Sequence, residues 1–315
     1  MPCLRGSASE THAHNSSRFS ARDTVGAGSA MTRVAAVMVT HNGGQRLLDQ
    51  IDTMCRQSRP LDQVVIVDDR STDGYVDRAV SRLREFHDDV IVRPARPGTG
   101  TDLFGRIGRN FAQGVDLAGP DVDFIVFADQ DDLWREDRVE VQAARLQDDP
   151  SCAVSAANGT VIDDSGSYSG QTLWDAFGVP RDWNERNDVE RLRVVLSRSV
   201  ATGAAMIARS AFAKSLGRPP GGWLHDRWYS IVAASRGALD LQDRSVIDYR
   251  QHDGQSAGLA GNSSRLSLLT QAVRGPIRAL DRFSAIHSLR SGSPSPLRRE
   301  LSYPMLVKTM ARRPS

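Results

Sequence analysis

Short apolar runs alternate with helix-like stretches along the first half of the chain. Each run is apolar and ends in polar residues, as a buried strand does, and the four runs are 32–42, 62–74, 89–100 and 122–132. Amphipathic stretches lie between them, and the helices they predict are 44–58, 75–86 and 107–118. Strands that alternate with helices indicate βαβ units. We therefore predict an α/β fold with a mostly parallel, Rossmann-like sheet flanked by helices.

The alternation is looser after residue 150. Residues 152–166 predict a strand pair or a strand with a turn, and 187–209 predict a helix followed by a glycine-interrupted strand. A loop and helix are expected over 221–237, and one or two strands over 238–254. Further on, apolar residues recur every three or four positions, although Gly275-Pro276 should break or kink a helix there: Leu266, Leu269, Val273, Ile277, Leu280, Phe283 and Ile286.

Composition and charge divide the chain into three parts. Residues 1–31 are rich in small polar residues and lack an apolar core, so we expect a disordered N-terminal extension. Residues 32–261 form the predicted α/β domain. Residues 262–315 carry ten lysines and arginines but two acidic residues, which predicts a basic, partly helical C-terminal segment. This segment either packs on the domain or lies on an anionic membrane surface.

The remaining composition places the protein in a broad class. No apolar stretch approaches the length of about 18 residues that a membrane-spanning helix needs. The three cysteines (Cys3, Cys55 and Cys152) are widely spaced and form no zinc or redox motif. A cytoplasmic protein is the expectation, with peripheral contact at the inner face of the cell membrane if the basic segment binds lipid.

Acidic residues gather where the predicted strands end. The sequence FADQDDLW places Asp129 and Asp131 one residue apart, so that two carboxylates can face one divalent cation. Alternatively, Asp131 or Asp132 caps the following helix. Asp68 and Asp69 follow an earlier strand, where a nucleoside could supply hydrogen-bond donors, or where Asp69 and Ser71 could form an Asx-turn. Ligands of parallel α/β sheets bind beyond these strand ends.

The two acidic motifs together carry a resemblance to a known family. The stretch VMVTHNGGQRLLDQIDTMCRQSRPLDQVVIVDDRSTDG, followed by FADQDDLWREDRV, resembles the inverting glycosyltransferases of family 2, which have the GT-A fold. The similarity is greatest to the rhamnosyltransferase-like branch, which builds surface polysaccharides. It covers about 33–260 and implies a GT-A, nucleotide-diphospho-sugar transferase fold for 32–261.

The resemblance implies roles for particular residues. His41 stands where the family usually has an aromatic residue, so an imidazole would stack on the nucleotide base. Asp131 is implied as the chief ligand of Mn²⁺ or Mg²⁺, with Asp129 beside it and His252, in YRQHDG, reaching the metal or diphosphate. The residues expected to bind the nucleotide sugar are Thr40, His41, Asn42, Asp69, Arg109, Asn110, Asp129 and Gly203.

Three downstream residues have a second interpretation each. Asp226, in WLHDRW, is implied as the catalytic base, although it could instead cap a helix. Gly203 permits a close backbone approach near the acceptor, or a tight turn in an ordinary strand. His252 could make a structural hydrogen bond instead of facing the metal.

The predicted function is metal-dependent, inverting transfer of a sugar from a nucleotide-diphosphate donor. Rhamnose is the sugar that the branch suggests, and the acceptor is a hydroxyl of a glycan or lipid-linked molecule in cell-surface polysaccharide synthesis. No nucleic-acid partner is expected. Two alternatives remain open: a nucleotide-sugar-binding protein without catalysis, and a nucleotidyltransferase on a similar sheet.

Overall fold

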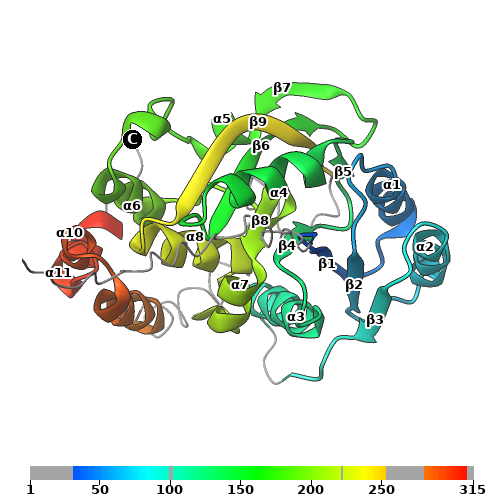
Figure 1. The fold of residues 1–315 in the computed structure, drawn as a ribbon, viewed down its shortest axis with the longest axis horizontal. Helices are drawn as coiled ribbons and strands as arrows, with labels where there is room; N and C mark the ends of the chain where they lie inside the picture. The colour runs from blue at the N-terminus through cyan, green and yellow to red at the C-terminus, as the bar shows by residue number, and fades with distance from the viewer. Residues whose placement is uncertain (1–30, 99–101, 221–222, 253–279, 311–315) are drawn as a thin grey trace, which may run out of the picture. The chain divides into compact units, whose positions relative to one another are not determined.

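The computed structural model describes residues 31–98, 102–220, 223–252 and 280–310. Thr32–Ser315 form one compact unit (Figure 1). Our predictions for 1–30, for the domain boundary at 261 and for the apolar repeat before residue 280 lie outside the described residues.

The described part of this unit contains nine strands and a larger number of helices. The strands are β1 (Val34–Thr40), β2 (Gln63–Asp68), β3 (Val90–Pro94), β4 (Phe124–Ala128), β5 (Leu133–Trp134), β6 (Val154–Ile162), β7 (Tyr168–Thr172), β8 (Met206–Arg209) and β9 (Leu239–Arg250). The α-helices are α1 (Gly44–Cys55), α2 (Tyr75–Arg84), α3 (Leu103–Leu117), α4 (Arg138–Asp148), α5 (Leu173–Phe177), α6 (Asp188–Ser197), α7 (Ser210–Leu216), α8 (His225–Ser235), α10 (Ser295–Arg298) and α11 (Tyr303–Met310). The 3₁₀ helices are η1 (Trp183–Glu185), η2 (Gly203–Ala205) and η4 (Leu289–Gly292).

One sheet runs through the whole unit in the order β3-β2-β1-β4-β8-β6-β9-β5, and β7 pairs with β6 outside that path (Figure 1). The strands β3, β2, β1 and β4 are mutually parallel, as the alternation of strands and helices predicts. The second half is mixed, because β8 lies antiparallel between β4 and β6 while β6 and β9 are parallel. The α/β prediction is confirmed.

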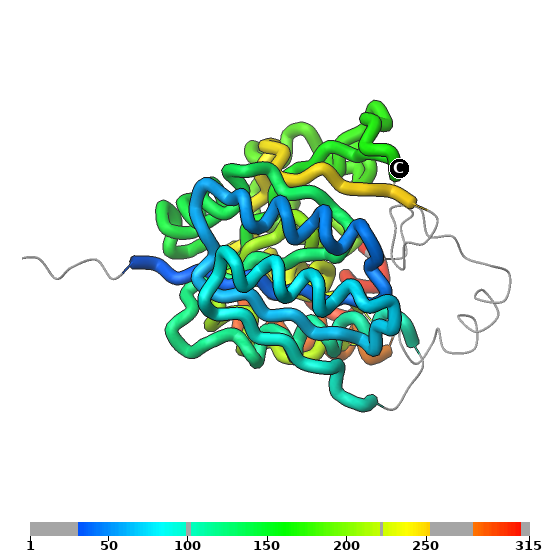
Figure 2. The backbone as a smooth tube through the Cα atoms, turned by 90° about the vertical axis from the view of Figure 1, so that its right-hand side faces the viewer, coloured from blue at the N-terminus to red at the C-terminus, as the bar shows by residue number. Residues whose placement is uncertain are grey.

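Alternate side chains of β1 serve two cores, one on each face of the sheet. Ala35 and Val37 join the cluster that includes Phe111 of α3. Val34, Ala36 and Met38 join the other cluster, which contains residues of α1 and α2. These two helices lie side by side (Figure 2). Burial on both faces explains why the first strands are apolar throughout and do not alternate with polar residues.

Local predictions for the second half are refined by the structure. Residues 152–166 contain one strand, β6, followed by a turn, and the described part of 238–254, which ends at residue 252, contains the single strand β9. Gly203 lies in η2, directly before β8, and therefore does not interrupt a strand.

The prediction that Asp131, Asp132 or Asp226 caps a helix is wrong. Asp137 is the N-cap residue of α4, whereas Asp131 and Asp132 precede β5. Leu224 is the N-cap residue of α8, and Asp226 lies in the first turn of that helix.

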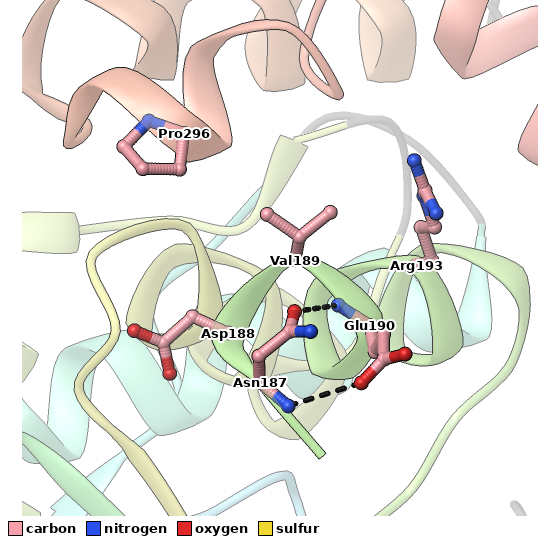
Figure 3. Close-up of a pocket in the computed structure, with 6 residues that line it drawn as sticks. All are labelled: Asn187, Asp188, Val189, Glu190, Arg193 and Pro296. Carbon is pink, nitrogen blue, oxygen red and sulfur yellow. Dashed lines mark hydrogen bonds between the residues drawn. The ribbon is translucent and has the colours of Figure 1, made fainter.

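The described part of the basic C-terminal segment packs on the same core. Four of its side chains are buried there: Ile286, Leu297, Leu301 and Leu306. Glu300, which is 2% exposed, forms a bidentate ion pair with Arg193 of α6 at 2.9 and 2.8 Å. Figure 3 shows a hollow where Pro296 of α10 faces the first turn of α6, and its lining includes none of the predicted site residues.

Candidate active site

The parallel strands bring the predicted site residues to one edge of the sheet. Thr40 is paired in register with Asp68 of β2, and Met38 is paired with Ala128, the last residue of β4. The turns after β1, β2 and β4 therefore continue beyond the same edge of the sheet. The D-x-D motif, which follows β4, meets the turns after β1 and β2 there.

Gln130, the middle residue of the D-x-D motif, joins this motif to the end of β1. Its Oε1 atom accepts hydrogen bonds from Thr40 Oγ1 and from the backbone N–H of His41, both at 2.8 Å. Its Nε2 atom donates to the His41 carbonyl at 3.3 Å. The sequence offers no signal for this role, because the two contacting segments are about 90 residues apart.

The turn after β1 also contacts the turn after β2. The imidazole Nδ1 of His41 lies 2.8 Å from the carbonyl oxygen of Asp69. Asn42, whose φ is +47°, donates its backbone N–H to Ser71 Oγ, and its Oδ1 accepts from the N–H of Thr72. These bonds fix His41 at the exposed edge, where a base could stack on it.

Asp69 is the buried carboxylate of the second motif, with 4% of its surface exposed. Its Oδ2 atom lies 2.8 Å from Arg106 Nε and accepts from Asn110 Nδ2 at 3.1 Å, while Oδ1 pairs with Arg70 Nε at 3.2 Å. Asn110 therefore orients Asp69, and Arg106 is a contact that sequence reasoning missed. The Asx-turn prediction named the wrong aspartate, because Ser71 donates its N–H to Asp68.

Arg109 lies one residue before Asn110 on α3, and its guanidinium lies against the loop after β3. A Cβ atom added to Gly98 would lie 2.7 Å from Arg109 Nη2. The position of this guanidinium therefore leaves no room for a larger residue at position 98.

The D-x-D aspartates have different partners. Asp131 is nearly buried, and its Oδ2 atom lies 2.9 Å from His252 Nε2, which brings together two predicted metal ligands separated by 121 positions. Asp132 accepts the backbone N–H of Arg250 at 2.9 Å. The end of β9 thus lies against the D-x-D motif.

Negative charge is concentrated in a poorly solvated space at this point. Burial, followed by the charges of Asp131 and Asp226, raises the pKa of Asp129 to about 7. Burial also raises the pKa of Asp132, to which Asp131 and Asp129 add. Because the charge of Asp226 acts on Asp129, the predicted base and the D-x-D motif share one electrostatic environment.

Arg138 is the buried counter-charge beneath the aspartates. Burial lowers its pKa to about 9, while the charges of Asp132 and Asp129 act in the opposite direction. Its guanidinium lies 4.0 Å from the ring centroid of Trp134 and donates to the Phe127 carbonyl at 2.9 Å. Arg138 does not offset the carboxylates, because the pKa values of Asp129 and Asp132 remain raised, so the ionised cluster has an excess of negative charge.

That excess suits a divalent cation. The Oδ2 atom of Asp132 is buried and has no hydrogen-bond partner in the described structure. Asp131 and His252 converge within 2.9 Å; carboxylate oxygens suit Mn²⁺ and Mg²⁺, and the imidazole is a common metal ligand. No group of three histidine, cysteine or acidic side chains within the described ranges could hold an ion by itself. A metal here would take its other ligands from substrate oxygens and water.

Asp226 lies in the first turn of α8, and backbone N–H groups hold both of its oxygens. Gly203 donates to Oδ2 at 3.1 Å and Arg227 donates to Oδ1 at 2.5 Å. Burial raises the pKa of Asp226, which these two bonds partly oppose. A fixed carboxylate with a raised pKa has the properties of a general base.

His225 is a packing residue, not a partner of the acids. The centroid of its ring lies 3.9 Å from the ring centroid of Phe111 and 4.7 Å from that of Phe127. Neither ring nitrogen has a hydrogen-bond partner within the described residues. Burial lowers its pKa to about 3, so the ring is neutral. A Cβ atom on Gly203 would lie 2.3 Å from His225 Nε2, which explains the glycine at that position.

Comparisons with known proteins agree with this arrangement. The sequence profile of glycosyl transferase family 2 matches residues 35–216, which is more than half of the chain. TuaG of Bacillus subtilis (strain 168), named as a teichuronic acid biosynthesis glycosyltransferase, is 25% identical over 149 residues. The match covers 47% of this chain and 50% of TuaG. The dTDP-rhamnosyl transferase RfbG of Shigella flexneri is 27% identical over 104 residues, 33% of this chain and 34% of RfbG. The chain thus matches half or less of the length of these relatives.

Solved structures show the same fold. The structure of S. aureus TarS 1-349 in complex with UDP-GlcNAc superposes with a TM-score of 0.58 at 14% identity, covering 90% of this chain and 74% of that chain. The GT-A fold implied by the resemblance is therefore confirmed. No helix in the described residues is both long enough and apolar enough to cross a membrane. From its matched profile and its fold, the chain belongs to glycosyl transferase family 2.

Proposed function

We propose that the protein is a metal-dependent, inverting glycosyltransferase that moves a sugar from a nucleoside-diphosphate donor to an acceptor hydroxyl. The observation that carries this proposal is the approach of Asp131 Oδ2 to His252 Nε2 at 2.9 Å beyond the parallel strands, beside Asp129, whose pKa is raised by burial and, in part, by the charges of Asp131 and Asp226. A base and a diphosphate site must lie on opposite sides of one reacting carbon, so they have to share one pocket.

The donor nucleotide occupies the edge formed by the first two strand-end turns. His41 stacks on the base, and Asp69, oriented by Asn110, accepts a hydrogen bond from it. The other nucleotide-sugar contacts that we propose are Thr40, Asn42, Arg109, Asp129 and Gly203. Gln130 positions the first of these through its hydrogen bonds to Thr40 and His41.

Asp131, Asp129 and His252 hold Mn²⁺ or Mg²⁺ in this proposal. When bound, such an ion neutralises the charge that grows on the leaving diphosphate. The buried carboxylates supply affinity for the cation, and the 2.9 Å contact between Asp131 Oδ2 and His252 Nε2 places two donor atoms where one ion could replace the proton between them.

Asp226 accepts the proton of the acceptor hydroxyl as that oxygen attacks the anomeric carbon. The bond to the diphosphate breaks on the opposite face, so one displacement inverts the configuration. Its two backbone hydrogen bonds hold the carboxylate in place, and burial raises its proton affinity toward the working pH. We expect this base to contribute about 10² to 10⁴ in rate.

The relatives suggest the substrates. RfbG is named as a dTDP-rhamnosyl transferase, and TuaG is named for teichuronic acid biosynthesis. The TarS structure is a complex with UDP-GlcNAc. We propose a rhamnose or related sugar donor, and a glycan or lipid-linked acceptor in cell-surface polysaccharide synthesis. The setting is cytoplasmic, at the inner face of the membrane.

The test is to incubate the protein with Mn²⁺ and a panel of UDP-, dTDP- and GDP-sugars, and to measure released nucleoside diphosphate. Asp226→Asn should retain donor binding and lose turnover by about 10²-fold or more. Asp182→Asn, which changes an exposed aspartate paired with Arg186, is the matched control. Near-normal transfer by Asp226→Asn would remove it as the base, and release of sugar 1-phosphate in place of nucleoside diphosphate would indicate a nucleotidyltransferase.

A further inference from the structure

Helix α4 carries two polar side chains on a buried face that is otherwise apolar. The helix packs against β6 and β8 (Figure 1), and its buried apolar side chains are Val139, Ala143 and Leu146. Arg138 and Gln142, one helical turn apart, are also buried, each with 0% of its surface exposed. Apolar residues of similar volume would pack there without the free energy that burying polar groups costs. The two side chains therefore call for a role beyond filling the core.

Arg138 fixes the direction in which the Gln142 amide points. Its Nε atom donates to Gln142 Oε1 at 3.1 Å, and a guanidinium has no atom that could accept a bond from the amide nitrogen instead. The Nε2 atom of Gln142 therefore donates elsewhere, to the carbonyl oxygen of Ala205 at 2.9 Å. Arg138 is itself anchored, because its Nη2 atom donates to the Phe127 carbonyl, two residues before Asp129. A continuous chain of bonds thus runs from the strand before the D-x-D motif to the end of η2.

The turn that Gln142 holds also holds the proposed base. η2 is a single 3₁₀ turn of three residues, with Gly203 at its start and Ala205 at its end, so its two ends move together. The N–H of Gly203 donates to Oδ2 of Asp226 at 3.1 Å. This bond comes from outside α8, whereas the other bond to the carboxylate comes from the N–H of Arg227 in the same helix. The position of Asp226 relative to the sheet therefore depends on where η2 lies.

We propose that Gln142, oriented by Arg138, is a positioning residue that holds η2 and thereby sets the place of the Asp226 carboxylate relative to the D-x-D motif. The inference rests on the proposed function, in which Asp226 is the base that must face the donor held at that motif. A displacement of about 1 Å can cost on the order of 10² in rate, so loss of the Gln142 bond should lower turnover without weakening the donor site.

The test compares Gln142→Met and Gln142→Glu with a matched control. Both variants lose the amide donor to the Ala205 carbonyl, and Gln142→Glu keeps an acceptor for Arg138, so either variant suffices if the other does not fold. The control is Gln63→Met. It removes another buried glutamine, which accepts the Gly119 N–H at the opposite end of the parallel strands.

Hydrogen exchange of the backbone of residues 202–206, followed by mass spectrometry of the peptides, reports directly on η2. We expect exchange to be about tenfold faster in both Gln142 variants than in the wild type, and unchanged in Gln63→Met. Wild-type exchange of η2 in the Gln142 variants would overturn the proposal. This measurement needs no substrate, so its result does not depend on the proposed function.

Steady-state kinetics separate positioning from a role in stability alone. With the donor that the wild type uses, kcat should fall by about 10-fold to 100-fold in the Gln142 variants. The KM for the donor and the Mn²⁺-dependent binding of nucleoside diphosphate should stay as in the wild type. A kcat equal to that of Gln63→Met would overturn the positioning role. If the wild type released no nucleoside diphosphate from any donor, the proposed function would fail, whereas the exchange of η2 would still decide whether Gln142 holds the turn.

Discussion

Replacing Gly203 with alanine tests how the turn before β8 is packed against α8. The added Cβ atom would lie 2.3 Å from His225 Nε2 and 2.6 Å from Cε1. Ordinary contacts begin at 3.4 Å, so the imidazole has to move by about 1.1 Å. The backbone at Gly203 has no positive φ, which means that the cost comes from this contact and not from backbone strain.

The ring has little freedom to move. His225 is 3% exposed and lies between Phe111 and Phe127, at centroid distances of 3.9 and 4.7 Å. Overpacking a core of this kind costs about 1–3 kcal/mol. The same displacement disturbs the hydrogen bond from the Gly203 N–H to Asp226, so turnover should fall together with the free energy of unfolding.

Urea unfolding followed by tryptophan fluorescence measures this cost, and a double-mutant cycle assigns it. In an His225→Ala background the methyl group has room, so Gly203→Ala should cost almost nothing and the coupling energy should be about 1–3 kcal/mol. The control is Gly292→Ala, whose Cβ atom meets nothing within 4 Å and should change stability by less than about 0.5 kcal/mol. An equal cost of Gly203→Ala in both backgrounds would refute the packing argument.

Three further predictions concern stability and reactivity. The native pKa of His225 is about 3, below the ordinary value of about 6.5, so the unfolded chain takes up the proton first as the pH falls. Lowering the pH from 7 to 5 should therefore cost the wild type about 2 kcal/mol more than His225→Gln in urea unfolding, and parallel pH profiles would contradict this. Arg193→Met should cost about 3 kcal/mol, because it leaves the buried Glu300 carboxylate unpaired, whereas Glu300→Met should cost about 1 kcal/mol, because the half-exposed Arg193 regains water. Equal losses in thermal unfolding would count against that asymmetry. Burial raises the pKa of Cys55 to about 11 and that of Cys152 to about 12, so iodoacetamide at pH 8 should label both, by peptide mass spectrometry, only after unfolding in urea.

The first half of the fold could be predicted because its signals are local. The apolar runs that become β1, β2 and β4 are buried on both faces, and the helices between them force parallel order. The antiparallel position of β8 between β4 and β6 could not be read in the same way. It depends on pairing between residues such as Val126 and Ile207, which are distant in sequence.

For the candidate site, the sequence indicates residue types better than it indicates contacts. The acidic strand ends and the D-x-D motif are visible in the sequence, and the structure brings Asp131 and His252 together. Gln130 and Arg106 were missed because their partners, Thr40 and Asp69, lie in other elements. The packing of the C-terminal segment was left open, since its buried leucines resemble those of any amphipathic helix.

Calorimetric titration of nucleoside diphosphates in the presence and absence of Mn²⁺ tests the proposed metal site most directly. We predict that Mn²⁺ strengthens binding to the wild type and to the Asp182→Asn control, and that this gain is lost in Asp131→Asn while the protein stays folded. Binding that does not depend on Mn²⁺, or an undiminished gain in Asp131→Asn, would contradict the claim that the strand-end aspartates hold a cation for the donor diphosphate.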